Sequence, residues 1–151
     1  MKGSIGQLAS AVHHRAQRIT NEKLSHININ KGLHYFFYVI SLNEGFSQDD
    51  LSKRVDINKP TTAKAVKHLI SKGYIKRVKN RFDSTVEHLY LTKAGKDIAE
   101  MVQGVYHENR EIAKQGLSDD EEKQLTHLLQ KVLDNLLDEH GKLFSDELLD
   151  E

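Results

Sequence analysis

Apolar residues recur at helical spacing along most of this chain, and short polar or glycine-containing turns separate the runs. Ile5, Leu8, Val12 and Ile19 follow the period of an amphipathic helix that ends near Asn21. Residues 31–43 are dense in Leu, Phe, Tyr, Val and Ile, in a run too long for a typical strand, which predicts a buried second helix. The chain therefore begins with two helices, of which the first has an apolar stripe that needs a partner.

Two helix starts follow closely and predict a helix-turn-helix. Ser47 is a typical N-cap residue, with carboxylates in the first turn behind it, and opens a short third helix whose inner face is Leu51 and Val55. Asn58 is the expected cap of a fourth helix that contains Pro60 in its first turn and stops at Gly73. The inner stripe of the fourth helix is expected to be Ala63, Val66, Leu69 and Ile70. Its outward side chains are expected to be Thr61, Thr62, Lys64, Lys67, His68 and Lys72.

The second half of the sequence predicts a hairpin and two more helices. Residues 74–79 and 86–91 are β-prone and flank a polar loop, 80–85. Thr92 can cap a fifth helix, and Ser118 opens a capping box for a sixth. Leucines and a valine cover more than one side of the sixth helix: Leu125, Leu128, Leu129, Val132, Leu133, Leu136 and Leu137. Another copy of the chain would hide them most simply, and Leu143, Phe144, Leu148 and Leu149 are expected to add a short last helix to the same surface.

Length and composition are those of one protomer with no internal boundary. The 151 residues include no Cys, which excludes disulfides, thiolate metal sites and cysteine redox switching. No run of 18 apolar residues occurs and no leader is apparent, so the sequence predicts no membrane contact and a cytoplasmic protein. The expected fold is mainly α with a two-stranded β wing, in which 30–92 form a winged helix-turn-helix lobe and 1–22 and 100–151 form dimerisation helices.

Charge is segregated along this neutral chain. Between Leu51 and Phe82 there are ten Lys or Arg residues against one acid, Asp56, whereas residues 117–151 carry eleven acids against three Lys. A local surplus of positive charge on a folded unit indicates a polyanionic partner, and the acidic end should face away from it. The simpler alternative is a solvated basic face of an ordinary helix.

The residue types fit a helix that enters the major groove of double-stranded DNA. Thr61, Thr62, Lys64 and His68 are the candidates for base contacts. The candidates for phosphate contacts are Lys53, Arg54, Lys67 and Lys72. Gln48 and Lys59 are two further members of the predicted interface. Lys79, Asn80 and Arg81 lie near the hairpin tip, where an Arg can reach into a minor groove.

Three further interpretations concern small ligands, metals and catalysis. His34, Tyr35 and Tyr38 are candidates to line a pocket for a small aromatic effector, although core packing explains them equally. His107 and Glu111, with His26, His34 or Glu22 as a third ligand, are weak candidates for a zinc site. No phosphate loop, nucleophile elbow or clustered catalytic groups occur, so neither an enzyme nor a cofactor is expected.

The order of these motifs resembles the MarR (multiple-antibiotic-resistance regulator) family of bacterial transcription factors. The resemblance covers about Asn30 to Leu137 and is carried by residues 48–55, by residues 58–69 followed by Lys72-Gly73-Tyr74-Ile75, and by residues 91–95. It implies a homodimer whose first and last helices intertwine and whose two winged helix-turn-helix lobes bind a pseudo-palindromic operator. It also implies a repressor or activator relieved by a small, often phenolic, ligand.

One position departs from the family pattern, and two other functions remain open. The family wing usually carries Asp-x-Arg, whereas this chain has Asp83-Ser84-Thr85, so either Arg81 substitutes for the missing Arg or the wing contacts are weaker than usual. The alternatives to a ligand-responsive regulator are a zinc-responsive repressor and an interaction adaptor that kept the winged-helix shape without binding DNA.

Overall fold

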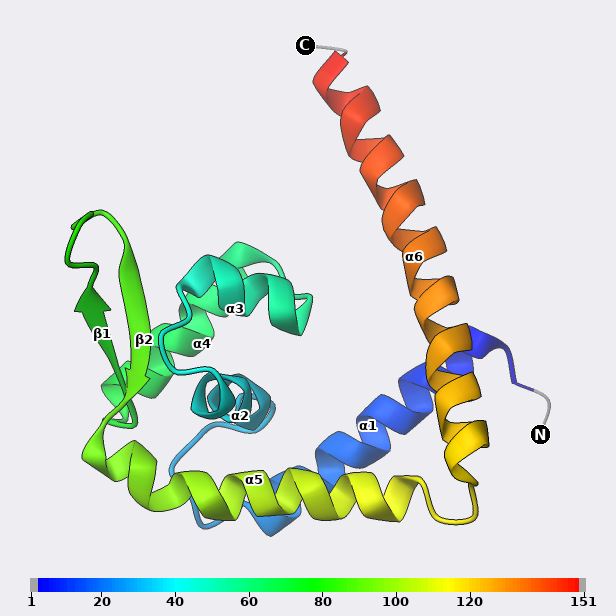
Figure 1. The fold of residues 1–151 in the computed structure, drawn as a ribbon, viewed down its shortest axis with the longest axis horizontal. Helices are drawn as coiled ribbons and strands as arrows, with labels where there is room; N and C mark the ends of the chain where they lie inside the picture. Colours follow the sequence, from blue (N-terminus) through cyan, green and yellow to red (C-terminus); the bar gives the residue numbers. More distant parts are fainter. Residues whose placement is uncertain (1–2, 150–151) are drawn as a thin grey trace. The chain divides into compact units, whose positions relative to one another are not determined.

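The computed structural model describes residues 3–149, and the side chains of residues 3–142. The chain divides into two compact units, Met1–Arg110 and Glu111–Glu151. The first unit contains the helix-turn-helix and the hairpin, and the second contains the last helix. Figure 1 labels the helices and strands of both units. No helix in the described part of the chain is both long and apolar enough to cross a membrane.

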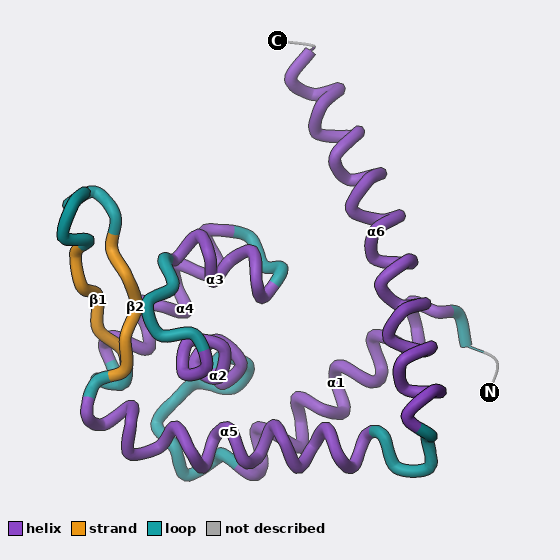
Figure 2. Tube along the Cα trace, in the orientation of Figure 1, coloured by secondary structure: helices purple, strands orange, loops and turns teal. Residues whose placement is uncertain are grey.

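Four helices, a hairpin and most of a fifth helix make up the first unit (Figures 1 and 2). The helices are α1 (Ile5–Lys23), α2 (His34–Leu42), α3 (Gln48–Val55), α4 (Lys59–Ser71) and α5 (Lys93–Ala113). The strands β1 (Ile75–Lys79) and β2 (Glu87–Leu91) pair antiparallel, with Ile75 opposite Leu91 and Lys79 opposite Glu87. The predicted fold class, mainly α with a two-stranded wing, is confirmed.

The helix boundaries follow from capping residues. The Ser47 hydroxyl accepts from the Asp50 backbone N–H at 3.1 Å, and the Asp50 carboxylate accepts from the Ser47 N–H at 3.0 Å. That backbone hydrogen bond lowers the pKa of Asp50 below its usual value. The Asn58 side chain accepts from the Thr61 N–H at 2.9 Å and starts α4. Each of these bonds satisfies a backbone donor that a helix N-terminus leaves unpaired, so the predicted starts of α3 and α4 are confirmed.

A tight turn joins α3 to α4 and fixes the helix-turn-helix angle. Asp56 ends α3 in the left-handed region, with φ 54°, and its N–H donates to the carbonyls of Ser52 and Lys53. The Ser52 hydroxyl then donates to the Ile57 carbonyl at 2.6 Å. These bonds satisfy backbone carbonyls at the end of α3 within a few residues, so α4 can begin almost immediately after it.

The core lies between the helix-turn-helix, α2 and the hairpin. Its fully buried side chains include Phe37 and Ile40 from α2, Leu51 from α3, and Val66 and Leu69 from α4, and β2 adds Leu89. Residues 45 and 46 bond to β2, because the Gly45 N–H donates to the Leu89 carbonyl at 2.8 Å and the Leu89 N–H to the Phe46 carbonyl at 2.7 Å. The hairpin is therefore fixed to the loop that precedes α3.

Gly95 allows α5 to start close to the base of the hairpin. A Cβ atom at this position would lie 2.2 Å from the Tyr74 carbonyl oxygen, far inside van der Waals contact. The Thr92 hydroxyl accepts from the Gly95 N–H at 3.1 Å and donates to the Gly73 carbonyl. The predicted cap at Thr92 is confirmed, and the same side chain ties the start of α5 to the end of α4.

The second unit contains α6 (Asp119–Leu149), which is one continuous helix. Ser118 and Glu121 form the predicted capping box, with two hydrogen bonds of 3.1 Å. The helix does not stop at Gly141, so the expected separate short helix after that residue is wrong. Leu143, Phe144, Leu148 and Leu149 lie in α6, but their side chains fall outside the described residues.

Candidate nucleic-acid interface and ligand pocket

The N-terminal half of α4 presents a polar and basic face. Thr61, Lys64 and Lys67 are exposed, whereas Thr62, Ala65, Val66 and Leu69 are buried at helical spacing. No Asp or Glu among the described residues lies within ion-pair distance of Lys64 or Lys67. These ammonium groups are therefore available to an anionic partner.

The predicted outward position of Thr62 is wrong. Its side chain is fully buried, and its hydroxyl donates to the Ile57 carbonyl at 3.4 Å. Sequence patterning treats Thr as polar and therefore as outward, but a Thr hydroxyl that finds a backbone acceptor can be buried at little cost. The predicted inner stripe is confirmed at Val66 and Leu69, which are fully buried, whereas Ala63 and Ile70 are only half-buried and the unpredicted Ala65 is buried.

His68 already has a partner within the protein. Its Nε2 accepts from the backbone N–H of Asn30 at 3.1 Å, which ties α4 to the loop before α2. Burial and then the charge of Lys72 lower the pKa of His68. The ring is therefore neutral at pH 7, and one of its two nitrogens is occupied.

The other predicted interface residues on α3 and at the start of α4 differ in their surroundings. Lys53 and Arg54 are exposed, and the Arg54 guanidinium lies 5.4 Å from the centre of the Phe46 ring. The Lys59 ammonium lies 3.6 Å from a carboxylate oxygen of Asp49. Gln48 is half-buried and accepts from Arg77 at 3.4 Å. Lys53, Arg54 and Lys59 therefore carry the exposed positive charge of this segment.

The hairpin tip combines two exposed cations with an ordered loop. Lys79 and Arg81 are exposed, whereas Asn80 is half-buried and uses both ends of its amide inside the loop. The Asp83 carboxylate accepts from the Thr85 hydroxyl at 2.6 Å and from its N–H at 3.0 Å. The hydrogen bond from the Thr85 hydroxyl lowers the pKa of Asp83. Thr85 occupies the position at which the family wing usually carries an Arg, and here it bonds to the acid of the same wing.

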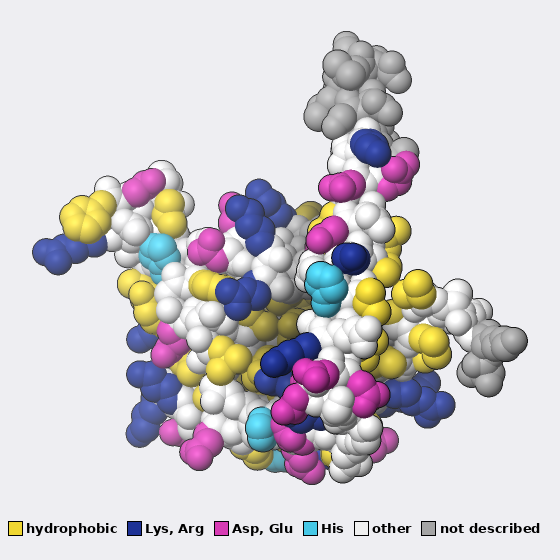
Figure 3. Space-filling view, turned by 45° about the vertical axis from the view of Figure 1, so that its right-hand side comes forward, with side chains coloured by type: hydrophobic (Ala, Val, Ile, Leu, Met, Phe, Trp, Pro, Cys, Tyr) yellow, Lys and Arg dark blue, Asp and Glu magenta, His cyan; other side chains and the backbone are white. Residues whose placement is uncertain are grey.

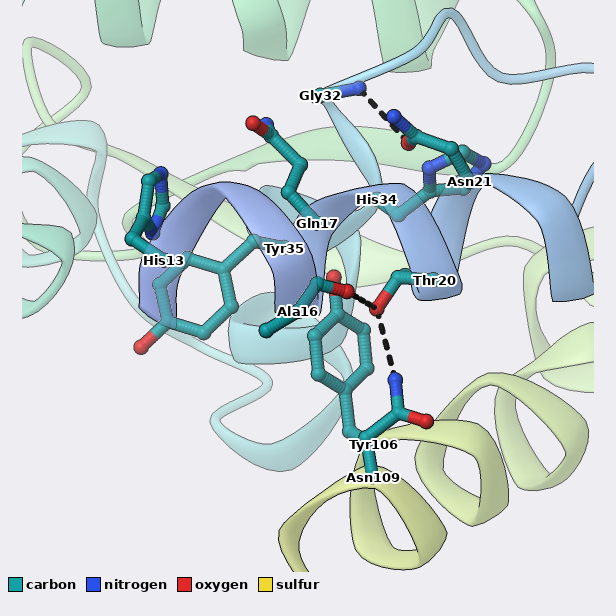
Figure 4. Close-up of a pocket in the computed structure, with 10 residues that line it drawn as sticks. All are labelled: His13, Ala16, Gln17, Thr20, Asn21, Gly32, His34, Tyr35, Tyr106 and Asn109. Carbon is teal, nitrogen blue, oxygen red and sulfur yellow. Dashed lines mark hydrogen bonds between the residues drawn. The ribbon is translucent and has the colours of Figure 1, made fainter. Parts of the chain in front are cut away.

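A cavity of about 210 Å³ lies between α1, α2 and α5 (Figure 4). Its lining contains no Asp, Glu, Lys or Arg and consists of His13, Ala16, Gln17, Thr20, Asn21, Gly32, His34, Tyr35, Tyr106 and Asn109. Two of the predicted effector residues, His34 and Tyr35, line it. The third, Tyr38, does not: its ring stacks on Tyr106 at 4.2 Å. Burial raises the pKa of Tyr106, so its phenol stays neutral.

His34 is the unusual residue of this cavity. It is 3% exposed, and neither ring nitrogen has a hydrogen-bond partner. Burial lowers the pKa of His34, so the ring is uncharged at pH 7. An unpaired buried donor or acceptor costs about 1–3 kcal/mol. His34 is therefore a buried polar group of the cavity wall that the chain itself leaves without a hydrogen-bond partner.

The α1 and α5 walls of the cavity were not predicted from the sequence. The Asn109 amide donates to the Thr20 hydroxyl at 2.9 Å, and Thr20 donates to the Ala16 carbonyl (Figure 4). The Lys23 ammonium group of α1 also contacts α5. It donates to the Asn109 Oδ1 at 2.9 Å and forms an ion pair with Glu108, whose Oε1 lies 3.2 Å away. These residues lie almost ninety positions apart, and no local pattern connects them.

The metal candidates are not assembled in the described part of the chain. No group of three or more His, Asp or Glu side chains gathers there at a distance that could hold an ion. The His26 Nε2 lies 3.2 Å from the Met101 sulfur, and His34 belongs to the cavity.

Comparison with known proteins identifies the family. The sequence model of the MarR family matches residues 34–84. The HTH-type transcriptional regulator BilQ of Clostridium symbiosum is 33% identical over 104 residues, covering 69% of this chain and 72% of that protein. This chain belongs to the MarR family. It is a transcriptional regulator of that family, with the winged helix-turn-helix fold described above.

Two solved MarR structures share the fold closely. The MarR protein from Peptoclostridium difficile superposes with a TM-score of 0.81 at 25% identity, covering 95% of this chain and 94% of that one. A mutant MarR from E. coli, complexed with operator DNA, gives a TM-score of 0.72 at 25% identity, covering 85% and 93%. Because these likenesses extend over most of both chains, the helices outside the residues matched by the family model belong to the shared fold.

Proposed function

We propose that this protein is a homodimeric, ligand-responsive repressor that binds a pseudo-palindromic DNA operator through α4 and the wing. The observation that carries the proposal is the exposed face of α4, on which Lys64 and Lys67 follow Thr61 without a nearby carboxylate. In a helix-turn-helix, the N-terminal residues of the second helix contact base edges in the major groove. The complex of the E. coli MarR with operator DNA supports the same use of the fold here.

The proposed contacts divide into base reading and phosphate binding. Thr61 and Lys64 lie in the first two turns of α4 and would read base edges, since a Lys donates to guanine O6 and N7. Phosphates would be bound by Lys53, Arg54, Lys59 and Lys67, with Lys79 and Arg81 at the wing. Thr62 has no part in the proposed interface because it is buried, and His68 and Asn80 act by holding the structure.

Lys64→Ala tests the proposal against the interaction adaptor. Loss of a base contact costs about 1–3 kcal/mol, so operator affinity should fall about tenfold or more, with relaxed preference at one base pair of each half-site. Lys67→Ala should weaken binding similarly on every duplex and leave the sequence preference unchanged. Fluorescence anisotropy with labelled duplexes measures both effects.

Lys96→Ala is the matched control, because Lys96 is an exposed residue of α5 outside the proposed interface. It should bind as the wild type does. If Lys64→Ala and Lys96→Ala bind DNA equally well, α4 is not the recognition helix.

Two separate apolar faces support the homodimer. Ile5, Leu8 and Val12 of α1 are each at least half exposed. In α6, Leu125, Leu128, Leu129, Leu133, Leu136 and Leu137 are all exposed, and hydrophobic side chains are visible along this helix in Figure 3. Apolar surface of this extent is unusual on a monomer and typical of an interface between identical chains. Each face would therefore be covered by the second copy.

The cavity between α1, α2 and α5 is the proposed effector site. Its volume of about 210 Å³ exceeds the roughly 150 Å³ that accommodates benzene in an engineered cavity, so a single aromatic ring fits. The lining offers no charged partner for a carboxylate, and His34 is neutral. An uncharged ring with one hydroxyl, which can bond to the unpaired imidazole, is the proposed ligand class.

Phenol and benzoate provide a matched pair of probes for this site. Phenol should raise the melting temperature of the protein, whereas benzoate should raise it less, because its charge loses solvation without gaining a cation. His34→Phe removes the unpaired nitrogens, so we expect the free protein to be stabilised and the response to phenol to be lost. Differential scanning fluorimetry measures all three shifts.

His107→Phe, at an exposed position of α5 outside the cavity, is the control and should respond to phenol as the wild type does. A larger shift with benzoate than with phenol would contradict the proposed ligand class.

A further inference from the structure

Phe82, at the tip of the wing, is the most exposed large apolar residue in the described part of the chain. It is 94% exposed, whereas the next, Val12, is 65% exposed. Burial of a Phe side chain stabilises a protein substantially, and this hairpin buries almost none of the Phe82 ring. An isolated exposed apolar residue is ordinary on a mobile tail, so its meaning here depends on how the loop is held.

A chain of hydrogen bonds fixes the backbone of the tip. The Asn80 Oδ1 accepts from the N–H of Phe82 at 2.8 Å and from the N–H of Asp83 at 3.1 Å. The Asn80 Nδ2 lies 2.9 Å from the His88 Nε2, and the His88 Nδ1 lies 2.8 Å from the Gly45 carbonyl oxygen. In the tautomer that carries its proton on Nδ1, the His88 Nδ1–H donates to the Gly45 carbonyl and the Nε2 accepts from the Asn80 amide. The support therefore runs from the loop before α3 to the peptide of Phe82.

Two backbone bonds close the base of the same loop. The Asn80 N–H donates to the Val86 carbonyl at 2.7 Å, and the Val86 N–H donates to the Asp83 carbonyl at 3.1 Å. The loop thus holds the Phe82 backbone in a defined position while leaving its ring outside. The ring is therefore positioned to contact another molecule.

Charge at the tip points to nucleic acid as the partner. Lys79 and Arg81 both precede Phe82 in the chain and are exposed, and Figure 3 shows a hydrophobic side chain next to Lys or Arg side chains at the end of the hairpin. The Asp83 carboxylate is engaged by Thr85 within the loop. An exposed apolar ring on the same hairpin tip as two cations matches a minor groove, where an apolar sugar lining lies close to phosphates.

We infer that Phe82 is a wedge that enters the minor groove and partly unstacks one base step beside each half-site. The inference rests on the proposed DNA-binding function and adds a contact that uses no hydrogen bond. Apolar side chains inserted in this way kink duplexes, and pyrimidine–purine steps such as TA open most easily. The wing would therefore prefer a flexible step, although it lacks the Arg at position 85 that the family pattern places there.

Phe82→Ala, Phe82→Leu and the wild type test the wedge. The probe is a duplex selected by the wild-type protein from a random pool, with 2-aminopurine placed at the step beneath the wing. Wild-type binding should raise the 2-aminopurine fluorescence, because unstacking relieves its quenching. Phe82→Ala should lose this rise and about tenfold in affinity, which is in the range of one aromatic contact with a base. Phe82→Leu keeps an apolar wedge and should retain most of both signals.

Leu42→Ala is the control, since Leu42 is 54% exposed at the end of α2 and lies outside α4 and the wing. It should behave as the wild type does. If Phe82→Ala binds with wild-type affinity and gives the same fluorescence rise, the wedge is wrong while the proposed function stands. If Phe82 instead controls binding to phosphatidylglycerol vesicles and not to the duplex, the wedge is also wrong. If the wild type selects no duplex at all, the proposed function fails with it.

Discussion

Raising the salt concentration from about 50 to about 200 mM should weaken the complex with an operator duplex by about 10³–10⁵-fold. Each lobe carries exposed cations at Lys53, Arg54, Lys67, Lys79 and Arg81. If the two lobes of a dimer neutralise six to ten phosphates between them, the release of that many counterions produces a dependence of this size. Lys59 should contribute less, because Asp49 lies 3.6 Å from it and already offsets part of its charge.

A titration of labelled duplex at four salt concentrations measures this dependence. The logarithm of the affinity should fall linearly with the logarithm of the salt concentration, and Lys67→Ala should make the slope shallower by about two per dimer. A flat response would contradict a phosphate-binding interface and would favour the interaction adaptor.

Leu129→Asp with Leu136→Asp should produce a monomer that binds the operator at least about 100-fold more weakly. The two leucines are seven residues apart on one side of α6, and they are 44% and 64% exposed in the protomer. Two carboxylates placed there would be buried without partners in the proposed dimer, at a cost of several kcal/mol. A monomer also loses the gain from linking two half-site contacts, which amounts to 10²–10⁴-fold in affinity.

Gln124→Asp with His127→Asp is the matched control for that double variant. Both residues are exposed and lie about a third of a turn or more around the helix from Leu129 and Leu136, so the variant adds two carboxylates to α6 away from these two leucines. Sedimentation equilibrium should show a dimer for this control and a monomer for the leucine variant. A leucine variant that remains dimeric would remove α6 from the proposed interface.

Much of the fold follows from local sequence signals. Ser47, Asn58, Thr92 and Ser118 each begin a helix as predicted, because a side-chain oxygen next to unpaired backbone donors acts within a few residues. The hairpin strands lie within one residue of the predicted positions for the same local reason. Gly141 shows the limit of such signals, since a single glycine does not end a helix whose neighbours continue it.

The predicted site was less complete, since its geometry depends on contacts distant in sequence. Thr62 was assigned outward because its hydroxyl is polar, and only the fold reveals the Ile57 carbonyl that receives it. Asn80 was assigned to the interface, but its amide meets His88 across the hairpin. The sequence does not predict the exposure of Phe82, because a lone aromatic residue in a polar loop carries no local signal of whether it is buried.

The most direct test of the central claim is selection of duplexes from a random pool by the purified protein, followed by footprinting of the enriched sequence. We expect two inverted half-sites whose centres are one helical turn apart, about 34 Å or 10 base pairs, with protection in the major groove of each. Enrichment of no sequence, or of one half-site bound by a monomer, would contradict this expectation.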